Sequence, residues 1–316
     1  MKLLLWLVVA ALAIGGATLW KAARHERQAE ATWPPEGRFL TIDGHRVHVV
    51  TRGSGPDLVL IHGASGNTRD FTHGLVERLA ERYRVIVVDR PGLGYTDRID
   101  PKGASLRQQA DLIARAAAEL GAERPIVFGH SYGGAVALAW ALDRPEGLAA
   151  LVVSAAASNP WDTGLGTYYT VLSHPLGQRL VVPLLTAWVP ERVVNRQIDS
   201  IFLPQAPPEG YHAHIGAGLT LRRVSMRANA LHRANLLEEI RAQAPRYAEI
   251  DVPVEILHGD ADRTVPLEVH SGPLSRQIPQ ASLTILPGIG HMPHHAAPGA
   301  TRAAIDRAAA RAGLGP

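Results

Sequence analysis

Ser131 lies at the centre of a Gly-x-Ser-x-Gly pattern formed by residues 129–133. The apolar run 125–128 before it is typical of a buried strand, and the Ala-rich run 135–142 after it is typical of a helix. A serine on so sharp a turn needs glycine two residues to either side, because side chains there would collide with it. The turn exposes the hydroxyl at a helix N-terminus, which stabilises developing negative charge. The pattern therefore predicts a serine nucleophile, although taken alone it also fits a strand that ends in a Gly-rich turn.

A serine nucleophile needs a histidine and a carboxylate, and both follow later in the chain. The histidine must accept the serine proton, and the carboxylate fixes the tautomer of the histidine and stabilises its charge. The loops after two later apolar runs, at residues 254–257 and 283–286, supply Asp260 and Asp262, and then His291 and His294. The order serine, acid, histidine is one that a doubly wound sheet presents at one edge. At this point both acids and both histidines are candidates.

The elements that would position these residues form an α/β pattern. Short runs that are apolar on both faces suit a parallel sheet covered by helices on each side. They lie at residues 58–61, 85–88, 126–128, 151–153, 254–257 and 283–286. Two alternating runs around Asp43-Gly44 indicate an antiparallel hairpin before them. Residues 105–120 and 296–312 have the clearest helical patterns. We therefore expect a mostly parallel, doubly wound sheet.

A long insertion separates the fourth and fifth of these parallel strands. It is punctuated by proline and otherwise helical in pattern, and it is far longer than a strand-to-strand crossover requires. We expect it to form a helical cap over the C-terminal edge of the sheet, where ligands bind in open α/β folds. The expected division of the chain is anchor 1–22, linker 23–38, first core part 39–157, cap 158–250 and second core part 251–316.

The N-terminus reads as a membrane anchor. Residues 3–20 are uncharged and almost wholly apolar, which matches the roughly 20 residues of a spanning helix better than a signal peptide of about 7–15 apolar residues. We expect a retained single-pass anchor in a bacterial inner membrane, with a cleaved signal peptide as the alternative. The basic residues after the span favour a cytoplasmic location of the globular part, whereas an anchored hydrolase is usually expected on the other side of the membrane. The orientation is therefore not predicted.

Composition excludes several classes of protein. The chain of 316 residues is 46% hydrophobic and has no cysteine, so it has enough apolar residues for a core but no disulfide, thiolate nucleophile or Cys-bound zinc. A net charge of +3 without a run of like charges gives no support to nucleic-acid binding. No His-Glu-x-x-His pair occurs, and we expect no metal and no organic cofactor. The oligomeric state is not predicted.

With these motifs in order, the chain from the hairpin at Asp43-Gly44 to the C-terminus resembles capped α/β-hydrolase-fold esterases and lipases. The resemblance implies that Asp262, the fourth residue of a Gly-x-x-Asp turn, is the acid and that His291 of Gly290-His291 is the histidine. The His-Gly-x-x-Gly motif at residues 62–66 implies one oxyanion donor, the N–H of Ala64, beside the N–H of Tyr132 that follows the nucleophile. Two neighbouring polar residues, Ser65 and Asn67, are candidates for substrate binding, although both are common turn formers.

The resemblance implies a serine hydrolase that cleaves a small-molecule carboxylic ester through an acyl-enzyme. Aliphatic residues of the cap favour a hydrophobic acyl group. Cofactor-free haloperoxidases and C–C bond hydrolases share the triad and remain alternatives, the latter with Arg222, Arg223 and Arg227 as the basic groups that an acidic substrate needs. A non-catalytic ligand-binding protein of the same fold is the alternative from another class. Ser131 argues against epoxide hydrolases and dehalogenases, which place an aspartate at this turn.

Overall fold

The computed structural model describes residues 1–315, so Pro316 at the end of the expected second core part lies outside it. One sheet has the strand order β1-β2-β4-β3-β5-β6-β7-β8. The pairs β1–β2 and β2–β4 are antiparallel and all others are parallel, which confirms the predicted sheet. The strands are β1 Arg38–Ile42, β2 His45–Arg52, β3 Asp57–Ile61, β4 Arg84–Val88, β5 Ile126–His130, β6 Ala150–Ser154, β7 Val254–Gly259 and β8 Ala281–Leu286.

Alternate residues of the central strands enter two different cores. Val59 and Ile61 pack with α4 (Leu106–Glu119) and α5 (Tyr132–Asp143) on one face. Leu58 and Leu60 pack with α3 (Leu75–Leu79) and α14 (Pro298–Arg311) on the other. Because both faces are covered, every position of β5 and β6 and all but the first position of β3 and β4 are buried, which explains why their sequences are continuous apolar runs. The shorter elements are α2 Arg69–Thr72, η1 Pro145–Gly147, α12 Ser271–Gln277 and α13 Pro293–Ala296.

Local signals fix the turns and helix starts. Asp43 and Gly44 both have positive φ, 50° and 79°, as a two-residue hairpin turn requires, and this confirms the predicted hairpin. At the start of α4, Ser105 accepts a hydrogen bond from the N–H of Gln108, whose side chain in turn accepts from the N–H of Ser105. This capping box satisfies two helix donors and explains why the helix begins where the sequence predicted.

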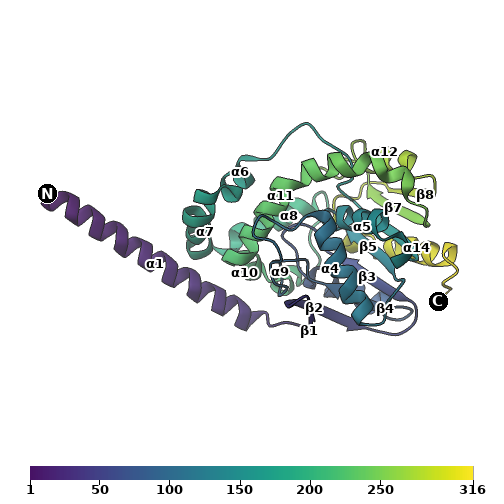
Figure 1. The fold of residues 1–316 in the computed structure, drawn as a ribbon, viewed down its shortest axis with the longest axis horizontal. Coiled ribbons are helices and arrows are strands. Elements are labelled where there is room, and N and C mark those ends of the chain that lie inside the picture. Colours follow the sequence, from purple (N-terminus) through teal and green to yellow (C-terminus); the bar gives the residue numbers. More distant parts are fainter. Residues whose placement is uncertain (316) are drawn as a thin grey trace.

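The insertion between β6 and β7 is helical and has a small core of its own. Leu172, Val182, Leu221, Met226 and Ala230 are its buried members. The elements are α6 Thr167–Ser173, η2 Gly177–Val181, α7 Val182–Trp188, α8 Glu191–Phe202, α9 Tyr211–Ile215, α10 Ala217–Thr220, α11 Arg223–Gln243 and η3 Ala244–Glu249. Figure 1 shows α6 and α7 between the N-terminal helix and the rest of the body, and α11 extending from there across the body toward α12.

The N-terminal helix α1 runs without interruption over Lys2–Thr32 and projects from the body (Figure 1). It differs from the expected division into an anchor 1–22 and a linker 23–38, because residues 23–32 are helical and only 33–37 connect α1 to β1. The Ala, Arg, Glu and Gln residues after Trp20 are strong helix formers, so the helix continues to the Pro34-Pro35 pair. The C-terminal half of α1 is therefore a rigid extension of the apolar segment that packs on the cap.

Candidate active site

Ser131 occupies a strained turn between β5 and α5. Its φ of 54° and ψ of −118° lie outside the regions that side-chain-bearing residues prefer. A Cβ at Gly129 would stand 2.3 Å from the carbonyl oxygen of Gly133, and a Cβ at Gly133 would stand 2.1 Å from the carbonyl oxygen of Ile61. Both glycines are thus required for the close approach of backbone to backbone. The turn has the conformation that the sequence pattern predicted.

The structure brings Ser131, His291 and Asp262 into one hydrogen-bonded chain. The Ser131 hydroxyl lies 3.0 Å from His291 Nε2, and His291 Nδ1 lies 2.7 Å from Asp262 Oδ2. His291 follows β8 and Asp262 follows β7, so both reach Ser131 from the C-terminal edge of the sheet. The imidazole and the carboxylate are buried, whereas Ser131 is partly exposed. The arrangement can transfer the serine proton to a histidine whose second nitrogen is held by a carboxylate.

The Asp262 carboxylate is held in its ionised form. One oxygen accepts hydrogen bonds from the N–H groups of Thr264 and Val265, at 2.8 and 2.9 Å. Burial alone would raise the pKa of Asp262, but hydrogen bonds from His258 and His291 outweigh it and hold that pKa well below its usual range. A negative charge therefore stands next to His291 Nδ1 throughout the neutral range.

The two rival candidates lie elsewhere. Asp260 accepts a hydrogen bond from the N–H of Gly288 at 2.6 Å, so it closes a turn between the loops after β7 and β8. His294 Nε2 faces Asp70 at 3.3 Å and does not contact Ser131. Of the two acids and two histidines that the motif order alone allowed, only Asp262 and His291 lie in the hydrogen-bonded chain to Ser131.

Two further histidines support this chain, and the sequence reading assigned a role to neither. His130, the residue before Ser131, donates from Nε2 to the carbonyl oxygen of His291 at 2.9 Å. Burial, followed by the neighbouring His294 and His291, lowers the pKa of His130 well below its usual value, so its ring is neutral. His258, at the end of β7, places Nε2 3.3 Å from Asp262 Oδ2. Their positions could have identified them from the sequence. His130 is the last residue of β5 and His258 the last but one of β7, and both strands lead into loops of the site.

The loop after β3 lies against Ser131. A Cβ at Gly63 would stand 3.3 Å from the Ser131 Cβ, which places this loop beside the serine. Within residues 1–315, the backbone N–H groups of Ala64 and Tyr132 donate to no protein acceptor. Backbone donors without a protein acceptor, one directly after the serine and one in the adjacent loop, are groups that an oxyanion requires. His62 orders the loop, because Nδ1 donates to the Gly63 carbonyl at 2.9 Å and Nε2 accepts from the Arg90 N–H at 3.0 Å.

Ser65 and Asn67 tie this loop to the cap. Asn229 of α11 accepts from the N–H of Ser65 at 2.9 Å and donates to its Oγ at 2.8 Å. Ser65 itself has a φ of 57°, so the cap holds a strained residue next to Ala64. The Asn67 amide donates to the Ile215 carbonyl and accepts from the Arg69 N–H. Their predicted role in substrate binding stays a prediction, and the contacts seen are structural. Asn229 was not identified from the sequence, because nothing local marks it.

A second cluster of polar side chains lies behind the site. Asp70 accepts hydrogen bonds from the Tyr211 hydroxyl at 2.7 Å, from His295 Nε2 at 2.9 Å and from His294 Nε2 at 3.3 Å. Two histidines and a carboxylate are metal-ligand types, and their atoms lie close enough to surround one ion. Because these hydrogen bonds and the tyrosine already account for the ligand atoms, we assign the cluster to packing of α13 against α2 and α9.

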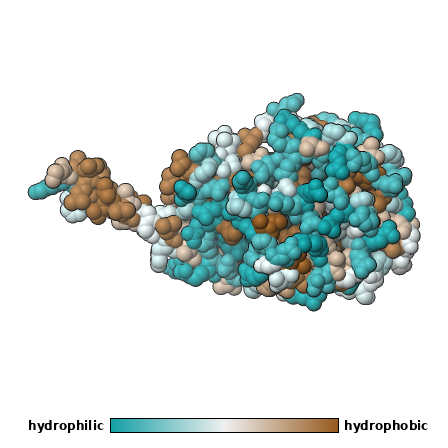
Figure 2. Space-filling view, viewed as in Figure 1, coloured by the Kyte–Doolittle hydropathy of each residue, from teal (hydrophilic) through white to brown (hydrophobic). Residues whose placement is uncertain are grey.

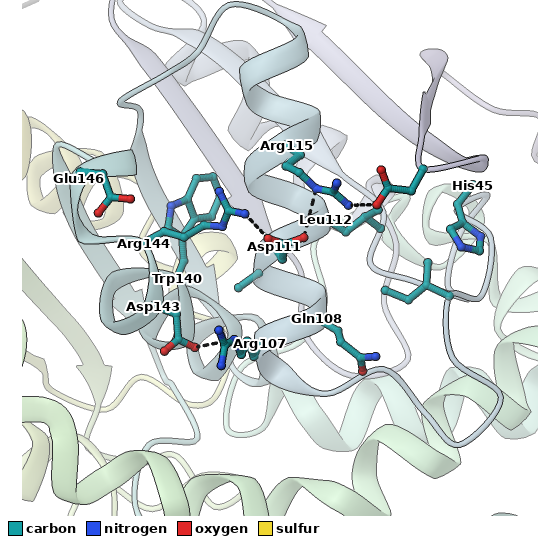
Figure 3. A pocket seen from close by; sticks show the side chains of 13 residues that line it. His45, Arg107, Gln108, Asp111, Leu112, Arg115, Trp140, Asp143, Arg144 and Glu146 are labelled. Carbon is teal, nitrogen blue, oxygen red and sulfur yellow. Dashed lines mark hydrogen bonds and ion pairs between the residues drawn. The ribbon is translucent and has the colours of Figure 1, made fainter.

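Two surface hollows lie away from Ser131. The larger, about 620 Å³, lies between the outer faces of α4 and α5. Figure 3 shows that its charged side chains pair with one another, as in Arg144 with Asp111 and Arg107 with Asp143. A smaller hollow of about 220 Å³ lies where the end of α1 meets α8. Since the arginine and aspartate charges of the larger hollow are mutually neutralised, we assign it no ligand.

Comparisons with known proteins identify the fold family. A family model described as the alpha/beta hydrolase fold matches residues 56–298. A pimeloyl-[acyl-carrier protein] methyl ester esterase of Nitrosomonas europaea is 29% identical, over 78% of this chain and 93% of the relative. A 2-hydroxymuconate semialdehyde hydrolase of Pseudomonas putida is 27% identical, over 82% and 88%. The crystal structure of a membrane phospholipase A superposes with a TM-score of 0.64 at 23% identity and covers 98% of this chain and 99% of its own. The chain therefore belongs to the α/β-hydrolase fold family, as its motifs implied.

Proposed function

We propose that the protein is a serine hydrolase that cleaves carboxylic esters through an acyl-enzyme. The observation that carries this proposal is the unbroken chain of hydrogen bonds from Ser131 through His291 to Asp262, at 3.0 and 2.7 Å. It rests on the strained serine turn and on a carboxylate that stays ionised. The homology to an esterase of the same family supports the reaction class.

In the first half-reaction, Ser131 Oγ attacks the ester carbonyl carbon while its proton passes to His291 Nε2. Asp262 stabilises the imidazolium that forms. The N–H groups of Ala64 and Tyr132 are the proposed donors to the oxyanion, and losing one such donor typically costs about 10²–10³ in kcat. The tetrahedral intermediate expels the alcohol, which takes the proton back from His291. A water molecule activated by His291 then attacks the acyl-enzyme and releases the acid.

The C–C bond hydrolase, one of the alternatives with the same triad, loses a support. Arg222 and Arg223 pair with Glu30 and Glu26 of α1, at 2.8 and 2.6 Å. Arg227 donates to the carbonyl oxygen of Gln178. Arg222 and Arg223 thus bind α11 to α1, and Arg227 binds it to η2 within the cap, so each of the basic groups expected for an acidic C–C hydrolase substrate already has a partner. An ester substrate needs no such charge.

The preference for a hydrophobic acyl group stays a prediction. Of the aliphatic cap residues that favoured it, Leu172 and Val182 belong to the cap's own core, and Val171 and Leu184 face solvent. These residues pack with one another or face solvent, so the preference for a hydrophobic acyl group rests on the composition of the cap alone.

We further propose that α1 tethers the enzyme to a membrane. It is one helix of 31 residues whose apolar segment is only 6% buried, and it meets the length and composition of a membrane-spanning helix. Residues 3–20 of this helix cover about 27 Å, close to the roughly 30 Å of the hydrocarbon layer.

The test is labelling of the detergent-solubilised full chain with a fluorophosphonate probe, read by intact mass. We expect one adduct on the wild type and on the control Ser200→Ala, an exposed serine of α8, and none on Ser131→Ala. An adduct that survives in Ser131→Ala would refute the assignment of the nucleophile. A folded wild type without any adduct would favour the non-catalytic ligand-binding protein.

A further inference from the structure

The segment from Leu176 to Trp188 is apolar on two opposite sides. Towards the cap core it packs Val181, Val182 and Leu185. The opposite side exposes Leu176, Leu180, Leu184 and Trp188, which we call the cap stripe. A spacing of four residues through η2 and α7 places these side chains along one side of the helix. Helices that are apolar all round are normally covered on every side, so the cap stripe is expected to meet a partner.

Exposed apolar side chains are concentrated in the cap. Within residues 1–315, the α/β part of the chain exposes only two large apolar side chains, those of Phe39 and Ile285. Outside residues 1–32, all others lie between residues 168 and 224. Figure 2 shows hydrophobic residues on the body near the base of α1, besides others elsewhere on the same face. Single exposed apolar residues are ordinary on a soluble surface, whereas a contiguous group marks a binding surface. The cap members are Tyr168, Val171, Leu176, Leu180, Leu184, Trp188, Val193, Ile201, Leu203 and Val224.

The position of α1 identifies the partner. Trp188, the last residue of the cap stripe, donates from Nε1 to Thr18 Oγ1 at 3.3 Å, and Lys21 Nζ lies 3.6 Å above its ring. Residues 18–21 are where the apolar segment of α1 ends and its charged half begins. In a helix that spans a bilayer, this boundary lies at the membrane surface, where Trp and Lys are favoured. The contact with Trp188 therefore brings the end of α7 to the same level.

From this placement we propose that the cap stripe lies in the surface of the lipid bilayer, as a second contact beside the spanning helix. Leu176, Leu180 and Leu184 enter the boundary between head groups and acyl chains, and the exposed Arg179 between them faces the head groups. The inference rests on the proposed tether. It adds that the cap itself touches lipid, so that α1 and α7 together fix the orientation of the domain on the membrane.

The absence of cysteine from the chain permits a direct test with single-cysteine variants of the full chain in phosphatidylcholine vesicles. A fluorescent bimane is attached at Leu180→Cys and at Leu184→Cys, whose native side chains are 63% and 45% exposed. Ile285→Cys is the matched control, because it is 47% exposed but lies on β8. Ala11→Cys, within the apolar segment of α1, reports on the tether. Quenching is compared between nitroxide-bearing lipids and aqueous iodide.

We expect the labels at positions 180 and 184 to be quenched by lipid nitroxides near the head groups and to lose most of their quenching by iodide. The label at 285 should show the opposite pattern, and the label at 11 should be quenched by nitroxides deep in the acyl region. If 180 and 184 behave like 285 while 11 is quenched, the cap contact is refuted and the tether stands. If 11 also escapes lipid quenching, the tether itself fails.

A second copy of the chain is the competing partner for the cap stripe, and it is distinguished in detergent. Nitroxide spin labels at position 180 would show spin–spin broadening between chains if two stripes faced each other, and this result would overturn the bilayer contact. Absence of broadening together with lipid quenching in vesicles supports it. The aspartate variant Leu180→Asp/Leu184→Asp should abolish neither folding nor fluorophosphonate labelling, since both side chains point away from the core.

Discussion

At the scale of single residues, the proposed chemistry depends on the contrast between Asp262 and Asp260. The two carboxyls are separated by one residue, yet one faces His291 and the other closes a turn. Asp262 keeps its charge because hydrogen bonds outweigh its burial, and a fixed negative charge is what an imidazolium needs in the transition state. Asp260 has no contact with the histidine. The pair thus offers a matched comparison within one loop.

We predict that Asp262→Asn lowers kcat for a dissolved ester by about 10⁴-fold, because the amide holds His291 in the wrong tautomer. KM should change little, since Asp262 does not reach the substrate carbonyl. Steady-state kinetics with a short-chain ester on the detergent-solubilised chain would measure this.

The control for this prediction is Asp260→Asn, which should keep kcat within a few-fold of the wild type. If both variants lost activity equally, or if Asp260→Asn were the more damaging, the acid would be wrongly assigned. Circular dichroism spectra of both variants would show whether either had lost its fold.

The glycines of the serine turn allow β3 and α5 to approach each other closely beside Ser131. Gly133→Ala would place a Cβ 2.1 Å from the Ile61 carbonyl oxygen, so β3 and α5 would have to separate. We predict a marked loss of Tm and of fluorophosphonate labelling. Gly299→Ala in α14 is the control, because its Cβ meets nothing within 4 Å and alanine favours a helix by about 0.5–1 kcal/mol. A Gly133→Ala protein as stable as the control would contradict the close approach.

At the scale of elements, the sequence predicted what local patterns encode. The apolar runs identified the six parallel strands because the central ones are buried on both faces, although β8 at the edge is partly exposed. Ser105 marked the start of α4 because capping is local. The continuation of α1 to Thr32 was missed, since its charged half reads equally as a linker. Asn229 and the partners of Arg222 and Arg223 were missed because they join segments more than 160 residues apart. These contacts form only when the cap packs against α1 and the core, and such packing leaves no periodic pattern in the sequence.

The contact between α11 and the loop after β3 gives a prediction at this scale. Asn229→Ala removes both hydrogen bonds that hold Ser65, the neighbour of the proposed donor Ala64. We expect kcat to fall by about 10-fold or more, less than the loss of a whole oxyanion donor, with KM nearly unchanged. Kinetics and Tm should be measured together, because a purely structural role would lower Tm without separating kcat from KM.

Asn235→Ala is the matched control for Asn229→Ala. Asn235 lies on the same helix and donates one hydrogen bond, at 3.2 Å, to the Lys102 carbonyl, away from the serine. Its removal should leave kcat unaffected. An equal fall in kcat for both variants would mean that any loosening of α11 disturbs the site, and Asn229 would lose its specific positioning role.

At the scale of the whole molecule, α1 and the cap are bound to each other by charge and by close packing. Glu26 and Glu30 pair with Arg223 and Arg222, and a Cβ at Gly218 would stand 2.8 Å from the Trp33 ring. The tether therefore ends in the cap and not in a free linker. A domain held in this way has a restricted orientation relative to α1, which is what a contact between the cap stripe and lipid requires.

Buried histidines make the stability of the whole domain depend on pH. Burial lowers the pKa of His62, His270 and His294 to about 4, below the roughly 6.5 of an unfolded chain. Between these values the unfolded state binds more protons, so stability is complete above about pH 6.5 and falls on acidification, by about 1 kcal/mol per pH unit for each histidine.

We predict a clear fall in Tm from pH 7 to pH 5 in detergent, with a shallower slope in His294→Gln. The exposed His174→Gln should keep the wild-type slope. A Tm that stays constant down to pH 5 would show that these rings are not buried in their neutral form.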